Sequence, residues 1–501
     1  MGFELDLDVI LKALDQVLHL KNLLIIFGGV LGGIVVGIIP GLSSTMAVAL
    51  MIPFTFSMLP EMALSLLVSV FVGGVSGGCV TAILIRMPGT PASIATLLDG
   101  YPMAQEGRAG QAIGNAVVAS FFGTVISGIV LVLMAPSLAE FAVKFHFAEY
   151  VAVSIFALTA VISITGSTLS RGLVTCLVGL LASAFGMSEE DGLPRFTFGN
   201  DSMMAGVELI PALMGVFAVS QMMHEAVRYR GGAEMVAAKM DRILPSMKDI
   251  TNNIVNYIRS SLIGTVVGII PALGGGPAGL IAYSQAKSAS KEPELFGTGH
   301  VPGIIASEAA NNATIGGALI IALTLGIPGD PVTAVLIGGL MVHGLQPGPL
   351  LFLNNPEIIY AIYFSVFFGS ICMAIILLTA VRPLSRVVEL PRRILVPVLF
   401  ILATAGVYSM NNRLIDVIVM CAFGGLGYIF DRYRYPLPPF ILGMLLGPLI
   451  EGNFRKMVSA EGHAWNLFTK PIALSFMFLS VAFLAYSLYR HNKGKAFIEK
   501  G

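Results

Sequence analysis

Charged residues are scarce in this 501-residue chain. They make up 12% of the sequence, whereas hydrophobic residues make up 56%. Lys plus Arg and Asp plus Glu are balanced at 29 each, so there is no basic surface for nucleic acid and no acidic tail. This composition excludes a water-soluble fold, because so much apolar surface needs lipid around it.

Cysteine is rare as well. The four cysteines lie far apart inside apolar runs, without metal-ligand spacing, and indicate neither a disulfide framework nor a metal site. Residues 1–20 are acidic and mixed, so we expect no cleaved signal peptide but an interfacial or periplasmic segment. A phosphate-binding Gly-x-x-x-x-Gly-Lys-Ser/Thr loop is missing, which excludes this route to nucleotide hydrolysis.

Long apolar runs are abundant, and a spanning helix needs about 20 apolar residues. Uninterrupted candidates are 23–39, 112–135, 150–165, 172–187, 206–222, 257–270, 357–381, 395–410, 414–430, 437–450 and 471–489. Glycine and proline divide four further stretches, at 40–59, 62–101, 272–283 and 302–352, which predicts broken helices or re-entrant hairpins there. The fold class expected is an all-α polytopic membrane protein with about 11–14 membrane segments.

The chain also repeats itself. Residues 33–40 read GIVVGIIP and residues 264–271 read GTVVGIIP, and Pro88-Gly-Thr-Pro91 matches Pro328-Gly-Asp-Pro331. Lys and Arg accumulate on the cytoplasmic side of membrane proteins. Threading the spans by this rule gives the two halves opposite topology, which is a recurrent plan of secondary transporters.

The domain organisation follows from the repeat. We predict an N-terminal segment at 1–20, repeat 1 at 21–222, a cytoplasmic connector at 223–255, repeat 2 at 256–452, and a last transmembrane helix with a cytoplasmic tail at 453–501.

Two motifs resemble a known family. The runs MPGTPASIATLLDGYPMAQEGR at 87–108 and SEAANNATIGG at 307–317, with LGIPGD at 325–330, are similar to the large membrane subunit of the tripartite tricarboxylate transporter family. The resemblance implies a multi-pass protein of the bacterial inner membrane that imports a carboxylate by symport with Na⁺ or H⁺. It also implies a periplasmic solute-binding protein and a small membrane subunit as partners, and a homodimer is one compatible assembly. No cofactor is expected beyond a coupling Na⁺.

A substrate site is predicted where the apolar repeats break. Ser43, Ser44 and Thr45 follow Pro40, and Gly274, Gly275 and Gly276 occupy the matching place in the second half. Hydroxyls and free N–H groups at a half-helix N-terminus favour an anion. The alternative is a kink with close packing.

A cation site is predicted at the other matched pair. Gly89 and Thr90 correspond to Gly329 and Asp330, and hydroxyl, carboxylate and carbonyl oxygens suit a small cation. The alternative is a turn at the membrane edge, although a carboxylate at membrane depth is expensive without a partner or a function.

Three polar residues share one predicted helical face. Glu308, Asn311 and Asn312 have the spacing for this, with Glu308 assigned to the cation and the asparagines to the substrate. Hydrogen bonding between helices is the alternative. Arg86 could clamp a substrate carboxylate or extend to the membrane surface.

Two other function classes are open. Ser43 with a distant His343 could act in an intramembrane hydrolase, but the strand-turn-helix context of such a nucleophile is absent. An ion channel is the other alternative, although channels seldom need two matched sets of broken helices.

Overall fold

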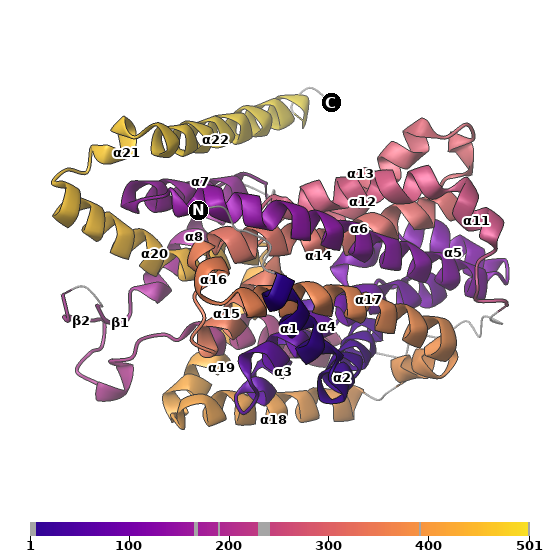
Figure 1. Cartoon of the computed structure of the whole chain (residues 1–501), viewed down its shortest axis with the longest axis horizontal. Coiled ribbons are helices and arrows are strands. Elements are labelled where there is room, and N and C mark those ends of the chain that lie inside the picture. Colours follow the sequence, from indigo (N-terminus) through magenta and orange to yellow (C-terminus); the bar gives the residue numbers. More distant parts are fainter. Residues whose placement is uncertain (1–6, 165–168, 189–190, 229–240, 390–391, 499–501) are drawn as a thin grey trace. The chain divides into compact units, whose positions relative to one another are not determined.

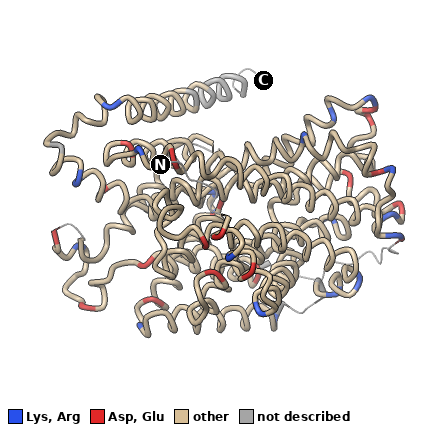
Figure 2. The backbone as a smooth tube through the Cα atoms, viewed as in Figure 1, with Lys and Arg blue, Asp and Glu red and all other residues tan. Residues whose placement is uncertain are grey.

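The structure is a computed structural model that describes residues 7–164, 169–188, 191–228, 241–389 and 392–498. Within these ranges the chain is almost entirely α-helical, and the only sheet is a two-stranded one (Figure 1). Eleven of the described helices are long and apolar enough to cross a membrane. Figure 2 shows long stretches of backbone without a charged residue. The predicted all-α polytopic membrane fold is therefore confirmed.

The chain forms two compact units, and each takes part of both predicted repeats. Unit 1 comprises residues 1–140 and 221–406, and unit 2 comprises residues 141–220 and 407–501. The chain passes from one unit to the other inside the helices α6, α10 and α18. The boundaries predicted for the repeats, and their opposite membrane orientation, stay predictions.

Unit 1 contains the duplicated motifs. Its elements are α1 (Leu7–Leu18), α2 (Leu20–Ile38), α3 (Ser44–Thr55), α4 (Pro60–Ile85), η1 (Pro91–Ile94), α5 (Leu97–Gln105), most of α6 (Ala109–Val143), α11 (Met247–Asn252), α12 (Ile254–Ile269), α13 (Gly275–Ala289), η4 (Pro293–Leu295), α14 (Val301–Leu325), α15 (Pro331–Val342), α16 (Pro349–Asn354), α17 (Pro356–Ser385), η5 (Arg386–Glu389) and most of α18 (Arg392–Asn411). The connector predicted at 223–255 is partly outside the described residues.

Glycine allows two pairs of helices to pack backbone against backbone. A methyl group added at Gly33 of α2 would collide with the carbonyl oxygen of Val70 on α4. In the second half, a methyl group at Gly268 of α12 would lie 2.7 Å from the carbonyl oxygen of Thr314 on α14. The small-residue spacing in the sequence therefore marks tight helix packing, as expected for a membrane protein.

The helices α4 and α14 end in the same way. Arg86 and Gly326 follow them in the left-handed conformation, with φ of 56° and 69°, and a Pro-Gly turn comes next. The breaks predicted within 62–101 and 302–352 include these turns, whereas α4 and α14 themselves run without interruption through their glycines. Interior glycine costs about 1 kcal/mol relative to alanine, but the close packing described above offsets this cost and lipid enforces a complete set of backbone hydrogen bonds.

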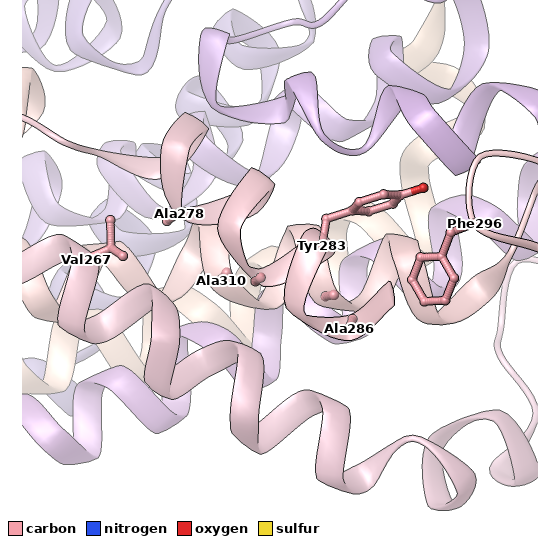
Figure 3. Packing of buried hydrophobic residues seen from close by; sticks show 8 residues of the cluster. Val267, Ala278, Tyr283, Ala286, Phe296 and Ala310 are labelled. Carbon is pink, nitrogen blue, oxygen red and sulfur yellow. The ribbon is translucent and has the colours of Figure 1, made fainter. Parts of the chain in front are cut away.

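Small side chains also fix the position of α13 on α14. Ala278, Ala282 and Ala286 are buried against Ala310, and Tyr283 packs its ring edge-on against Phe296 (Figure 3). This packing sets the place of the α13 N-terminus.

Unit 2 contains the remaining elements. They are α7 (Phe147–Ile164), α8 (Leu169–Ser183), strands β1 (Gly186–Met187) and β2 (Pro194–Arg195), η2 (Asp201–Met203), α9 (Leu209–Leu213), the π-helical turn η3 (Met214–Val219), the start of α10 (Ser220–Arg228), α19 (Leu414–Arg432), α20 (Leu437–Glu461), α21 (Asn466–Thr469) and α22 (Pro471–Ile498). The antiparallel strands pair Gly186 with Arg195 and Met187 with Pro194.

Candidate functional site

The three glycines predicted to bind substrate form the start of α13. Gly274 precedes the helix with φ of 63° and ψ of −172°, a conformation that glycine adopts most readily. The helix has 15 residues, so its first turn offers free N–H groups and the positive end of the helix dipole. This local structure is the one that attracts anions.

Asn311 of α14 faces this helix start. A methyl group at Gly275 would collide with Oδ1 of Asn311, so the amide lies directly against the first turn. The residue is 1% exposed, and neither Oδ1 nor Nδ2 has a hydrogen-bond partner among the described residues. Buried polar side chains are nearly always paired. An unpaired amide at a helix N-terminus is therefore a candidate ligand-binding group.

The turn Pro88-Gly-Thr-Pro91 of the first half also lies beside the start of α13. A methyl group at Gly276 would lie 3.2 Å from the carbonyl oxygen of Pro91, and one at Gly275 would lie 3.0 Å from Cβ of Ala92. Thr90, immediately before, is buried, with Oγ1 at 3.5 Å from Oγ of Ser93. The structure thus brings one predicted cation motif beside the predicted substrate glycines.

The matching turn of the second half is also adjacent. The carbonyl oxygen of Gly329 accepts a 2.8 Å hydrogen bond from the N–H of Ala272, and Cβ of Asp330 lies 3.7 Å from a methyl group added at Gly274. Gly89 and Gly329 both pack against helix backbone, since a methyl group at Gly329 would lie 2.6 Å from the carbonyl oxygen of Gly268.

Asp330 also caps a helix. Its Oδ1 accepts hydrogen bonds of 2.7 Å from both the N–H and the hydroxyl of Thr333, and its own N–H donates to Oγ1 of Thr333 at 3.0 Å. This reciprocal pair is a capping box at the start of α15. The carboxylate therefore has a structural task whether or not a cation binds it.

Ser43, Ser44 and Thr45 begin α3, as predicted from the break after Pro40. Oγ of Ser43 accepts a 3.1 Å hydrogen bond from the N–H of Met46, and Cβ of Ser44 lies 2.9 Å from a methyl group added at Gly74. The carboxylate of Glu225 on α10 reaches Gly41 just before this helix, and sequence reasoning missed it. No local signal linked Glu225 to the first repeat.

Glu308 and Asn312 form a second polar cluster, which is fully buried. The Glu308 carboxylate accepts hydrogen bonds from the hydroxyl of Thr96, from the hydroxyl of Ser120 at 3.2 Å, and from Nδ2 of Asn312 at 3.3 Å. Nδ2 of Asn312 also donates to Oγ of Ser120 at 2.8 Å, and Oδ1 accepts from Ser76 at 2.6 Å. Asn311 faces the start of α13, and its side chain also interacts with the Glu308 carboxylate.

The sequence did not identify the other members of the cluster. Ser76, Thr96 and Ser120 lie in apolar runs where hydroxyl residues are common, so no local signal distinguished them. Each meets α14 across more than 180 positions of the chain.

Arg86 is exposed at the end of α4. Its guanidinium carbon lies 5.6 Å from the ring centroid of Tyr101, which is cation–π geometry. This contact agrees with the alternative that the side chain extends to a surface, and substrate binding by Arg86 stays a prediction.

The Ser43 and His343 pair has no catalytic geometry. Nε2 of His343 lies 3.0 Å from Oγ1 of Thr55, the last residue of α3, whereas Ser43 precedes the first. The 12-residue helix between them is about 18 Å long. This arrangement does not support a hydrolase.

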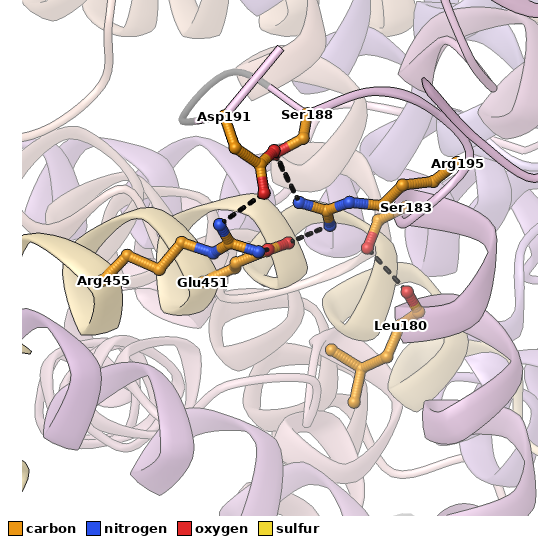
Figure 4. A network of polar contacts seen from close by, with 7 residues as sticks. All are labelled: Leu180, Ser183, Ser188, Asp191, Arg195, Glu451 and Arg455. Atoms are coloured by element: carbon orange, nitrogen blue, oxygen red, sulfur yellow. Dashed lines mark hydrogen bonds and ion pairs between the residues drawn. The ribbon is translucent and has the colours of Figure 1, made fainter. Parts of the chain in front are cut away.

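A separate ion-pair network lies in unit 2. Arg195 donates to Glu451 at 2.8 Å, and Arg455 donates to Asp191 at 2.9 Å and pairs with Glu451 at 2.8 Å (Figure 4). Hydrogen bonds from Ser188 and then Arg455 hold the pKa of Asp191 well below its usual range. The neighbouring Glu189 and Glu190 lie outside the described residues.

This network borders a cavity of about 220 Å³ next to the strands. Arg195 and Glu451, which line it, are paired with each other. Because these two charges neutralise each other, neither is left to bind a carboxylate in the cavity. The network instead anchors the loop between α8 and α9 to α20.

Comparison with known proteins identifies the family. Residues 23–442 match the tripartite tricarboxylate transporter TctA family. The chain belongs to this family. The matched range includes both the helix start with Asn311 and the Glu308 cluster, so the two candidate sites lie within the TctA-family region.

Two relatives from Agrobacterium vitis are similar to this TctA-family chain. An uncharacterized 52.8 kDa protein in the TAR-I ttuC' 3'region is 33% identical over 483 residues, which is 96% of each chain. An uncharacterized protein in the TAR-II ttuC' 3'region is 34% identical over 240 residues, covering 47% of this chain and 99% of the relative. No solved structure matches the chain.

Proposed function

We propose that this TctA-family protein is the large permease subunit of a binding-protein-dependent secondary transporter. It imports a small organic acid across the bacterial inner membrane, by symport with Na⁺ or H⁺, together with a periplasmic solute-binding protein and a small membrane subunit. Family membership supports the transporter class. The proposal adds three points to this: that the substrate is a carboxylate, that a Na⁺ or H⁺ gradient drives its transport, and that the protein lies in the bacterial inner membrane.

One observation carries the substrate proposal. The buried, unpartnered amide of Asn311 faces the free N–H groups at the start of α13. A carboxylate bound there would accept hydrogen bonds from Nδ2 of Asn311 and from the backbone of Gly275 and Gly276. The hydroxyls of Ser43, Ser44 and Thr45 would supply the matching site of the first half.

Charge explains why a co-transported cation would help. Asp330 lies beside Gly274, so an anion in the proposed site would meet a second negative charge. A cation near Thr90, Asp330 and the carbonyl groups of Gly89 and Gly329 would offset it. Substrate and cation would then each bind more tightly in the presence of the other.

Uptake into proteoliposomes that contain the complete three-component system tests this proposal. A panel of labelled dicarboxylates and tricarboxylates is offered under an imposed Na⁺ or H⁺ gradient, without ATP. We expect one gradient to drive accumulation of at least one acid, and omission of the binding protein to abolish it. Failure of every gradient, or full uptake by this chain alone, would contradict the proposal.

The substrate site is tested by Asn311→Ala. Loss of a hydrogen bond to a charged ligand costs about 1.5–3 kcal/mol, so the half-saturating substrate concentration should rise by about 10-fold to 100-fold. The matched control is Asn453→Ala, because Nδ2 of Asn453 bonds only the carbonyl group of Leu449 in its own helix. Equal effects of the two variants would remove Asn311 from the site.

A further inference from the structure

Glu308 carries a carboxyl group in the interior of unit 1 without a cationic partner. Its side chain has no exposed surface, and no ion pair of this residue occurs in the described part of the chain. An ionised carboxylate at such a place is costly unless hydrogen bonds, a metal ion or a proton compensate the charge. The groups around Glu308 indicate which of these three compensates its charge.

Every hydrogen bond to the carboxylate comes from a donor that belongs to a side chain. The hydroxyl groups of Thr96 and Ser120 and the amide of Asn312 serve both oxygen atoms. A hard cation would need these hydroxyl oxygens to turn their lone pairs toward it, and their hydrogen bonds to the carboxylate would then be lost. The titratable group facing Glu308 is the buried thiol of Cys79 on α4. The groups that reach Glu308 from the start of α5, from α6 and from α14 itself are hydroxyls and the amides of Asn311 and Asn312.

The hydroxyl of Ser76 gives this cluster two alternative hydrogen-bond patterns. It lies 2.6 Å from Oδ1 of Asn312 and 2.9 Å from the carbonyl oxygen of Val72, but it has one proton and can fully serve only one acceptor. When Ser76 donates to Asn312, Nδ2 of Asn312 points at Glu308, and the cluster stabilises an ionised carboxylate.

The second pattern matches a neutral carboxyl group. When Ser76 donates to Val72, its oxygen becomes free to accept from Nδ2 of Asn312. The amide is then reversed, and Oδ1 faces Glu308 at the position now held by Nδ2. That oxygen can accept a hydrogen bond from Glu308 only if the carboxyl group carries a proton, and it can also accept one from the hydroxyl of Ser120.

We propose that Glu308 binds the transported proton and that the Asn312 amide reverses as the proton arrives and leaves. The inference rests on the proposed function and specifies its coupling ion as H⁺. The proton moves from water to one carboxylate oxygen and returns to water on the other side, so no further reactant is needed. Glu308 and the substrate site at Asn311 are one helical turn apart, and the Asn311 side chain also interacts with the Glu308 carboxylate.

The test measures substrate accumulation in proteoliposomes that hold the complete system at zero membrane potential. With one proton per substrate molecule at zero membrane potential, each unit of imposed pH difference should raise the internal-to-external substrate ratio about tenfold. Glu308→Gln, a permanently neutral mimic, should lose this accumulation while it retains exchange of internal for external substrate. Glu149→Gln is the matched control, because Glu149 is a buried glutamate outside this cluster that accepts from the N–H of His146.

The outcomes separate this inference from the function on which it rests. Accumulation driven by Na⁺ alone, or Glu308→Gln that still accumulates about tenfold per pH unit, would overturn the proton assignment and leave the transporter intact. If neither a Na⁺ gradient nor a H⁺ gradient drives accumulation of any substrate, the proposed function itself is refuted.

A second measurement covers the case in which Glu308→Gln fails to fold. In the purified wild-type protein, infrared spectroscopy should show a protonated carboxyl band that shifts when Asn312→Ala removes its hydrogen-bond partner. An unshifted band in Asn312→Ala, or no such band across the pH range of transport, would overturn the proposal.

Discussion

The hydroxyl of Ser76 and Oδ1 of Asn312 lie 2.6 Å apart, fully buried, although 236 positions of the chain separate them. Ser76 belongs to α4 of the first half and Asn312 to α14 of the second. This bond therefore joins the two long helices that follow the duplicated glycine motifs.

Ser76→Ala should weaken the packing of α4 on α14 and lower the free energy of unfolding. Side-chain hydrogen bonds between membrane helices contribute on average about 0.6 kcal/mol and at most about 1.7 kcal/mol, and we expect a loss in that range. Thermal unfolding in detergent measures it. Ser475→Ala is the control, because this exposed serine bonds only the carbonyl group of Pro471 in its own helix. A double-mutant cycle with Asn312→Ala should show coupling, and strictly additive effects would argue against the bond.

Two adjacent glycines of α2 should respond oppositely to alanine. At Gly33 a methyl group meets the backbone of α4, whereas at Gly32 nothing lies within 4 Å. We expect Gly33→Ala to destabilise the protein by about 1–3 kcal/mol through overpacking. Gly32→Ala should be neutral or stabilise the helix by up to about 1 kcal/mol. Equal melting temperatures for the two variants would contradict the predicted packing of α2 on α4.

Substitutions of Asp330 separate its capping role from the predicted cation role. Asparagine is as good an N-cap as aspartate, whereas alanine costs about 0.5–2 kcal/mol. Asp330→Ala should therefore lower the melting temperature more than Asp330→Asn does. If Asp330→Asn keeps its stability but loses cation dependence of transport, the charge acts in coupling. Unchanged cation dependence would leave Asp330 as a helix cap only.

The loop between α8 and α9 should loosen in acid. The folded-state pKa of Asp191 lies below its unfolded value because of Ser188 and Arg455. The ionised form therefore favours the anchored loop above the unfolded value, about 3.9, and this contribution is lost as the pH falls through the folded-state value. Amide exchange of residues 191–193 and 195, corrected for intrinsic rates, should accelerate in that window. Asp191→Asn should abolish the acceleration and Asp201→Asn, in the same loop, should not.

Membrane orientation can be read from cysteine labelling in a background without the native cysteines. Lys248→Cys, in the predicted cytoplasmic connector, should resist a membrane-impermeant reagent added to intact cells. Ser202→Cys should react, because it precedes the predicted span 206–222, which leads into that cytoplasmic connector, and so lies on the opposite side of the membrane. Both residues are exposed. Labelling of Lys248→Cys from outside would refute the predicted topology.

The sequence alone determined the membrane class, most of the spans and the place of the breaks. These follow from local properties: apolar runs long enough for the bilayer, and Pro-Gly pairs that end a helix. Local reasoning does not explain why α4 runs unbroken through its glycines, because the α2 backbone against which Gly73 and Gly77 pack is not visible in the local sequence.

The tertiary structure decided which polar residues meet. Asn311 and Asn312 are neighbours with the same chemistry, yet Asn311 faces the start of α13 and Asn312 faces Ser76 and Glu308. Thr96 and Ser120 join Glu308 only because α5 and α6 are brought against α14. Such contacts depend on how helices far apart in the chain pack, and on the direction in which each side chain leaves its helix, which residue spacing alone does not specify.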